Sequence, residues 1–312
     1  MHPASPPIVT RTPGKINLLL AVGGQYDDGY HKIVNVFQAV DLYEDISVRW
    51  APEWSLHFTG SHSLLVDDDN LVLRAGRLLA SRAADLRTAS SPENLAAACM
   101  VRKRVPIAGG MAGGSADAAG TLVALAKLWR LEVAREQLGE MAAELGADVP
   151  FSLVGGTAIG TGRGDRLTAV ITRESYHWVL VTQAEGLSTV DVYRRFDELV
   201  DDGEIDATGK ARALSEAESV VTALATGDPE QLGRHLRNDL QAAAISLRPS
   251  LQRTLDEARD LGAVAGIVSG SGPTIALLAG DAHHAAALAQ SLLARGHQAS
   301  VVSSPARGSH VL

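Results

Sequence analysis

The sequence predicts a mixed α/β (α+β) protein of two domains that meet near residue 165, covering residues 1–165 and 166–312. Three observations support this prediction. The chain has 312 residues, 46% hydrophobic and 21% charged, which is enough for two ordinary cores. Segments with the polar and apolar alternation of strands are interspersed with segments of helical spacing. The pattern changes near residue 165, after which an acidic segment at 197–206 and most of the predicted helices follow.

Individual elements follow from the two periodicities and from glycine and proline positions. The predicted strands cover residues 8–22 (broken at Pro13-Gly14), 33–50, 94–104, 178–182, 264–268, 274–279 and 299–303. The predicted helices cover residues 70–84, 118–129, 134–145, 211–225, 229–244, 249–261 and 282–295. Glycine-rich residues 155–164 predict a hairpin, and the acidic run 197–206 predicts a solvated loop or helix face. Two domains of this kind leave a cleft between them that can bind a ligand.

Composition excludes several classes of protein. The net charge is −8 without a Lys/Arg block, so we expect no nucleic-acid partner. The single cysteine, Cys99, excludes an intramolecular disulfide and a cysteine-rich zinc site. The amino terminus lacks the pattern of a signal peptide, and the uncharged stretch 261–280 is interrupted by several glycines and Pro273. We therefore expect a cytoplasmic protein that neither crosses nor binds a membrane.

The strongest local signal is Gly109-Gly-Met-Ala-Gly-Gly-Ser115, directly before an amphipathic helix. Its four glycines allow the main chain to curl with N–H groups pointing inward, a nest for anionic oxygens. The helix that follows adds unpaired N–H groups and the positive end of its dipole. Ser115 can cap that helix or contact a phosphate or its magnesium. The alternative is a flexible loop followed by a helix that Ser115 caps.

The two commonest nucleotide-binding motifs do not fit. A Walker A loop requires Lys and then Ser or Thr after its second Gly, whereas Gly114 is followed by Ser115 and Ala116. A dinucleotide-binding fingerprint is nearly present at Gly160-Thr-Gly-Arg-Gly164, but Asp165 stands where the third Gly belongs. The phosphate site must therefore belong to another fold.

Three further segments are weaker signals on their own. Lys15, in Pro13-Gly-Lys-Ile-Asn-Leu18, opens an apolar strand, where a lysine would be partly buried and need a carboxylate. The alternative is a surface lysine. Asp148 follows a predicted helix in an apolar setting, as a reactive group or as an ordinary helix cap or turn residue. Val268-Ser-Gly-Ser-Gly-Pro-Thr274 predicts a tight turn between two strands, with or without a role in binding.

Together, these four segments resemble the GHMP kinases, in the same order along the chain. The resemblance covers about residues 9–305 and implies a ribosomal-protein-S5-like amino-terminal domain and a ferredoxin-like carboxy-terminal domain. It implies ATP and a small-molecule substrate in the cleft, with Mg²⁺, for which Ser115 is the candidate ligand. The residues implied to bind ATP are Asn70, near the adenine, and Pro106, Ile107, Ala108, Gly109, Gly110, Met111, Ala112, Gly113, Gly114, Ser115 and Ala116.

Flanking residues resemble the branch of the family that phosphorylates a cytidine-diphosphate-linked sugar alcohol. These are Asp28-Gly-Tyr-His31, Phe37-Gln38, Leu145-Gly-Ala-Asp-Val-Pro-Phe151 and Gly186-Leu-Ser-Thr-Val-Asp-Val-Tyr193. That likeness implies Lys15 and Asp148 as the catalytic pair. It implies a substrate site of Asn17, Tyr30, His31, Thr189 and Tyr193. A homoserine or mevalonate type of kinase and a non-catalytic ATP-binding module are the alternatives.

Overall fold

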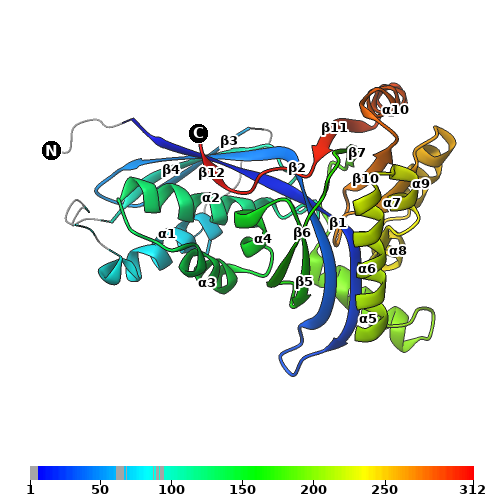
Figure 1. The fold of residues 1–312 in the computed structure, drawn as a ribbon, viewed down its shortest axis with the longest axis horizontal. Helices are drawn as coiled ribbons and strands as arrows, with labels where there is room; N and C mark the ends of the chain where they lie inside the picture. Colours follow the sequence, from blue (N-terminus) through cyan, green and yellow to red (C-terminus); the bar gives the residue numbers. More distant parts are fainter. Residues whose placement is uncertain (1–5, 61–66, 68, 87, 89–90, 92–94) are drawn as a thin grey trace.

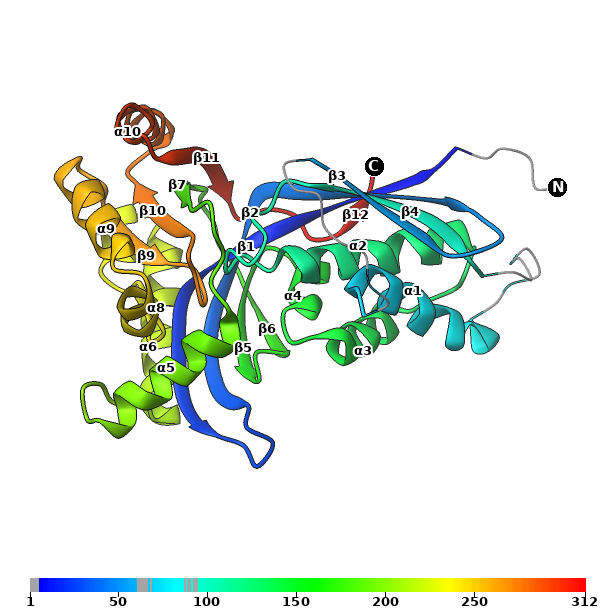
Figure 2. The same cartoon turned by 180° about the vertical axis from the view of Figure 1, so that it is seen from behind.

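The computed structural model describes residues 6–60, 67, 69–86, 88, 91 and 95–312. Two long strands, β1 (Ile8–Gln25) and β2 (His31–Trp50), reach from the helices of the first half of the chain to those of the second (Figures 1 and 2). They belong to a large sheet, and the second half adds a smaller one. This mixed α/β architecture confirms the predicted fold class.

The large sheet has the order β12-β1-β2-β4-β3, with β5 beside β2, β6 beside β5 and β8 beside β1. Its pairs are antiparallel, except that β3 runs parallel to β4 and β8 parallel to β1. The remaining strands of the sheet are β3 (Ser55–Gly60), β4 (Ala97–Lys103), β5 (Thr157–Gly162), β6 (Arg166–Val170), β8 (Arg237–Asn238) and β12 (His310–Val311).

Helices of the first half pack together against the large sheet (Figure 1). They are α1 (Leu71–Ser81), η1 (Ala83–Asp85), α2 (Gly113–Leu128), α3 (Arg135–Leu145) and α4 (Val149–Val154). Helix α2 is almost wholly buried, and Gly120 allows it to approach the strands closely. A Cβ at Gly120 would lie 2.7 Å from Thr12 Oγ1, and Thr10 Oγ1 donates a hydrogen bond of 2.9 Å to the Gly120 carbonyl. This contact fixes the position of α2 and of the loop that leads into it.

The smaller sheet has the order β11-β7-β10-β9, with every pair antiparallel. Its strands are β7 (Tyr176–Thr182), β9 (Ala265–Val268), β10 (Ile275–Ala279) and β11 (Gln298–Ser304). The helices of this half are α5 (Thr189–Asp201), α6 (Lys210–Thr226), α7 (Pro229–Gly233), α8 (Gln241–Leu247), α9 (Ser250–Asp260) and α10 (Ala282–Ala294). Among the described residues, no helix combines the length and the apolar character needed to span a membrane.

The two halves are closely joined. Strands β8 and β12 come from the second half of the chain but pair with β1. One core cluster includes Ile16 and Val36 from the large sheet, Trp178 from the small sheet and Val220 from α6. The exact division at residue 165 stays a prediction, since β6 follows it and still pairs with β5.

Two details of the predicted elements were wrong. Pro13-Gly14 does not break the first strand, because β1 absorbs it as a register shift against β2 and continues. The predicted helix 229–244 is two short helices separated by β8. Asn238, in β8, donates from Nδ2 to the Val268 and Gly270 carbonyls, both at 2.7 Å, so tertiary contacts outweigh helix propensity there. Of the predicted strand 94–104, Asn94 lies outside the described residues.

Candidate active site

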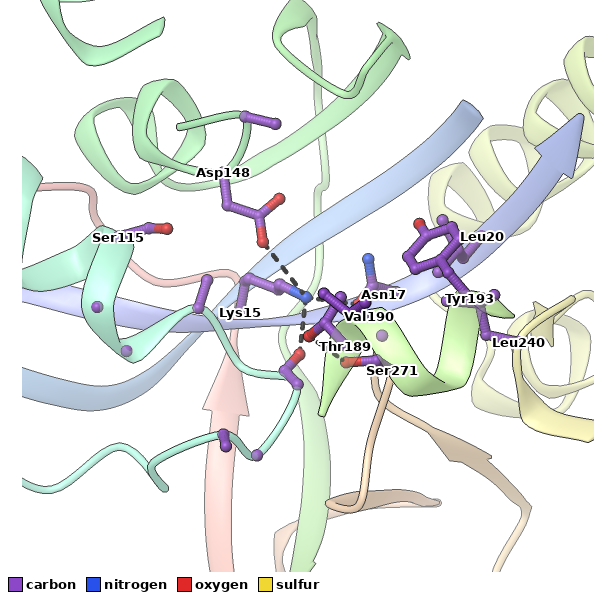
Figure 3. A pocket seen from close by; sticks show the side chains of 18 of the residues that line it. Lys15, Asn17, Leu20, Ser115, Asp148, Thr189, Val190, Tyr193, Leu240 and Ser271 are labelled. Carbon is purple, nitrogen blue, oxygen red and sulfur yellow. Dashed lines mark hydrogen bonds and ion pairs between the residues drawn. The ribbon is translucent and has the colours of Figure 1, made fainter. Parts of the chain in front are cut away.

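A cavity of about 940 Å³ lies between the two halves, and residues from both line its walls. Figure 3 shows Lys15 at its centre, with Asp148 from the first half of the chain and Thr189, Tyr193 and Ser271 from the second. The cavity also includes the glycine loop and the amino end of α2. The structure therefore brings the separate sequence motifs to one place.

Lys15 is the buried centre of the site. Its Nζ donates hydrogen bonds of 2.7 Å to Asn17 Oδ1 and of 2.7 Å to the Gly110 carbonyl, and lies 3.8 Å from Asp148 Oδ2. Burial lowers the pKa of Lys15, and the nearby Asp148 carboxylate opposes that shift. Lys15 is therefore not a surface lysine, and its ammonium is held by fixed oxygen atoms.

Asp148 lies between α3 and α4, immediately before the first residue of α4. Asp148 is the N-cap residue of α4, but its side chain accepts no capping hydrogen bond from the described backbone of that helix, so capping does not occupy the carboxylate. Buried Leu145 and Val149 anchor the segment on either side, while about a third of the Asp148 side chain remains exposed to the cavity. A carboxylate placed in this way can accept a hydrogen bond, or a proton, from a bound hydroxyl.

The glycine loop curls through three residues with positive φ: Ala108 at 48°, Gly110 at 75° and Ala112 at 58°. Helix α2 then begins at Gly113, and no side chain caps it within the described structure. Ser115 lies in the first turn rather than at the cap, so the alternative of a Ser-capped helix is wrong. Left-handed residues before an uncapped helix start form an anion nest with inward N–H groups.

The turn between β9 and β10 packs against this loop from the second half of the chain. Ser269 Oγ donates a hydrogen bond of 3.1 Å to the Gly110 carbonyl, and a Cβ at Gly110 would overlap the Ser269 carbonyl oxygen. A Cβ at Gly109 would lie 2.9 Å from Thr274 Oγ1, and one at Gly270 would lie 3.1 Å from Lys15 Nζ. Glycine is needed at these three positions because the loop, the turn and Lys15 are in close contact.

The other end of the cavity is formed by side chains. His31 is buried, and its Nε2 lies 2.8 Å from Asp197 Oδ1; its ring lies 5.0 Å from the Tyr193 ring. Tyr30 is 61% exposed, and the Arg163 guanidinium lies 4.7 Å from its ring centre. Asp197 belongs to the acidic run predicted as a solvated loop or helix face. It lies on α5 with 37% of its side chain exposed, and it also lines the cavity and pairs with His31.

The other predicted residues also line the cavity, except Met111 and Ala116, which are fully buried in the protein and do not line it. Thr189 Oγ1 lies 2.9 Å from Ser271 Oγ, which joins the start of α5 to the turn after β9. Asn17 donates from Nδ2 to Asn35 Oδ1 at 2.9 Å. Asn70 caps α1, since its Oδ1 accepts a hydrogen bond of 3.0 Å from the Val72 N–H. Burial and the Asp148 charge both raise the pKa of the Tyr193 hydroxyl.

Several lining residues were missed by the sequence analysis. They are Asn35, Lys103, Asp117, Arg163, Asp197 and Ser271. Two of them had a signal, since Arg163 lies in a glycine-rich segment and Ser271 in a Gly/Ser turn, both noted above. The others lie in strands or helices whose local pattern does not distinguish them from structural residues.

Two family models match the chain: "GHMP kinases N terminal domain" over residues 70–156 and "GHMP kinases C terminal" over residues 220–298. A 4-diphosphocytidyl-2-C-methyl-D-erythritol kinase of Mycolicibacterium gilvum is 46% identical over 312 residues, covering 98% of this chain and 92% of the relative. The kinase of the same name from Nocardioides is 44% identical and covers 97% and 99%. The chain belongs to this branch of the GHMP kinases.

Solved structures agree with this family assignment. A crystal structure of 4-(cytidine 5'-diphospho)-2C-methyl-D-erythritol kinase superposes with a TM-score of 0.73 at 30% identity, covering 94% of this chain and 98% of that one. A homoserine kinase from Cytophaga hutchinsonii superposes with a TM-score of 0.74 at 17% identity, covering 100% and 99%. The second comparison shows the shared GHMP kinase fold alone, whereas the first shares its name with the curated relatives.

Proposed function

We propose that this GHMP kinase transfers the γ-phosphoryl group of ATP to the 2-hydroxyl of 4-diphosphocytidyl-2-C-methyl-D-erythritol, giving the 2-phosphate and ADP. The reaction is a step in isoprenoid precursor biosynthesis. The observation that carries the proposal is the placement of Lys15 and Asp148 between a phosphate nest and a pocket of aromatic and polar side chains. Relatives of 44–47% identity over nearly the whole chain bear the name of this kinase.

Phosphoryl transfer requires the protein mainly to position the reactants and neutralise charge. The N–H groups of the glycine loop and the start of α2 hold the ATP phosphates. Asp148 accepts the proton of the substrate hydroxyl, a role that typically contributes about 10²–10⁴-fold to the rate. Lys15 Nζ, 3.8 Å from Asp148 Oδ2, stabilises the negative charge that develops at the attacking oxygen.

Magnesium fits the donors present at the phosphate end. Mg²⁺ takes oxygen ligands and is usually held by one or two protein groups together with substrate phosphates. The hydroxyl of Ser115 lines the cavity and would hold it. Within the described part of the chain, no group of three or more His, Cys, Asp or Glu side chains forms a site of its own. When bound, the ion neutralises charge on the phosphates.

The cytidyl group is selected at the opposite end. Tyr30 and Tyr193 offer aromatic faces for a pyrimidine, and Asn17 and Thr189 offer polar atoms. His31 is the more constrained residue, because its Nε2 is already paired with Asp197. We infer that Asp197 fixes the ring of His31, so that the remaining ring nitrogen is available to the polar edge of the base.

An ATP-consumption assay tests the proposed function. The purified chain is incubated with ATP, Mg²⁺ and the cytidyl substrate, and in parallel with homoserine, mevalonate or galactose. We expect turnover with the cytidyl substrate alone. Turnover with one of the other three alcohols would reassign the chain within the family, and ATP binding without any turnover would favour a non-catalytic module.

A further inference from the structure

A buried cluster of three charged side chains, Lys103, Glu44 and Asp117, lies beneath the phosphate nest. Lys103 Nζ lies 2.6 Å from Glu44 Oε1 and 2.7 Å from Asp117 Oδ2, and at most 6% of any of the three side chains is exposed. Burying three charges costs free energy that ion pairing often fails to offset relative to apolar side chains. The phosphate nest therefore packs against a buried ion cluster, although apolar side chains there would have cost less folding free energy.

The cluster holds both ends of the phosphate loop, residues 104–112. Glu44 Oε2 accepts a hydrogen bond of 2.9 Å from the N–H of Arg104, the first residue of the loop. Asp117 lies near the start of α2, the helix that begins where the loop ends. A Cβ at Gly113 would lie 3.4 Å from Lys103 Nζ, so the ammonium also adjoins the first residue of the helix. A single ammonium thus links the entry and the exit of the loop.

The cluster has two carboxylates for one ammonium. Burial raises the pKa of Asp117 to about 7, Lys103 from β4 opposes the shift, and Glu44 from β2 adds to it. Burial alone would lower the pKa of Lys103, but the two carboxylates outweigh that effect and raise it. Asp117 Oδ1 has no hydrogen-bond partner among the described residues. A negative charge that is only half balanced therefore lies beneath a site for phosphates.

We propose that Lys103 is a positioning residue which, held by Glu44 and Asp117, fixes both ends of the phosphate loop and sets the affinity for ATP. This inference rests on the proposed function, since it requires ATP phosphates at the loop. Loss of Lys103 would leave two buried carboxylates beneath the phosphates and release both ends of the loop. The loss of Lys103 should weaken the binding of ATP and leave the binding of the second substrate unchanged, because the second substrate binds at the other end of the cavity.

The first test is Lys103→Met, measured by steady-state kinetics and by nucleotide titration without acceptor. We expect the ATP KM and the nucleotide Kd to rise at least tenfold, while the KM for the cytidyl substrate changes less than twofold.

Arg237→Met is the matched control. It removes a cation paired with Asp239 at 2.8 Å and with Glu216, away from the loop. The control should lower thermal stability and leave the ATP KM unchanged. An ATP KM within twofold of the parent in a folded Lys103→Met variant would overturn the proposal, as would an equal rise in both KM values.

A second variant keeps the proposal testable if Lys103→Met does not fold. Asp117→Asn preserves shape and an acceptor for Lys103 but removes the excess charge. We therefore expect the nucleotide Kd of Asp117→Asn, measured at the same pH as that of the parent, to fall about threefold, because less negative charge lies next to the phosphates. An unchanged nucleotide Kd in a folded Asp117→Asn variant would overturn the proposal.

These titrations also separate the inference from the proposed function. A parent protein that binds ATP at least tenfold more tightly than Lys103→Met but does not phosphorylate the cytidyl substrate would contradict the proposed function alone. A parent protein that phosphorylates that substrate, with nucleotide affinity insensitive to both variants, would contradict the inference alone.

Discussion

The two ends of the cavity are built in different ways. At the end proposed to bind phosphates, the candidate binding groups are backbone N–H groups of one continuous segment, residues 108–113, where close contacts leave no room for a side chain at Gly109 or Gly110. At the end proposed to bind the substrate, side chains meet from segments far apart in the chain. They are Tyr30 just before β2, His31 at the start of β2, Arg163 after β5, and Tyr193 and Asp197 on α5. One end is encoded by a local motif, and the other depends on the whole fold.

This difference has a consequence for substitutions. ATP binding should weaken when atoms are added at the phosphate end, because the loop, the β9–β10 turn and Lys15 leave no room for a Cβ at Gly110 or Gly270. Binding of the cytidyl substrate should weaken when side-chain atoms are removed at the substrate end, because each side chain there offers one aromatic face or one hydrogen-bonding group. The residue where the two ends meet, Asp148, should be the most sensitive of all.

Asp148→Asn is expected to have the largest effect. The amide cannot accept the hydroxyl proton, so kcat should fall at least a hundredfold, while the nucleotide Kd changes less than threefold. Stopped-assay kinetics combined with nucleotide titration measure both quantities. Turnover close to that of the parent would remove Asp148 from the proton transfer and leave it only an orienting role.

Gly110→Ala tests whether atoms added at the phosphate end weaken ATP binding. The new Cβ would overlap the Ser269 carbonyl oxygen and also requires a positive φ, so the loop must shift. We expect the ATP KM to rise at least tenfold, with the KM for the cytidyl substrate little changed. Gly139→Ala on α3 is the control, since a Cβ there meets nothing within 4 Å. Equal ATP KM values for the two variants would contradict this view of the loop.

The same contrast explains which parts of the molecule were predictable. The glycine loop, Lys15 and Asp148 lie in short segments whose residue order predicts the proposed chemistry, and the structure places all three at one cavity. Asp197 looked like part of a solvated acidic run, because the contact with His31 spans 166 residues and has no local signature. Strand β8 was missed for a similar reason, since its pairing with β1 and the Asn238 hydrogen bonds arise only in the folded chain.

Tyr30→Ala should raise the KM for the cytidyl substrate by about tenfold to a hundredfold, because stacking on one base is worth about 1–3 kcal/mol. The turnover number should change much less, since the contact exists in both the ground state and the transition state. Tyr26→Ala is the matched control. The Arg163 guanidinium also lies near Tyr26, 5.7 Å from the centre of the Tyr26 ring, but Tyr26 does not line the cavity. A fall in kcat with an unaltered KM would assign Tyr30 to a different step.

The smallest effect is expected for Asp197→Asn, which tests whether the substrate end depends on side chains held by distant partners. The amide can still accept a hydrogen bond from His31 Nε2, now 2.8 Å from Asp197 Oδ1, but without the carboxylate charge. The difference between a charged and a neutral hydrogen bond is about 1 kcal/mol, so the cytidyl KM should rise about fivefold. The ATP KM should not change, because the nest lies at the other end of the cavity. Asp201→Asn, at the end of the same helix and outside the cavity, is the control. An Asp197→Asn variant as active as Asp201→Asn would show that His31 is positioned by ring packing against Tyr193 and Phe196 instead.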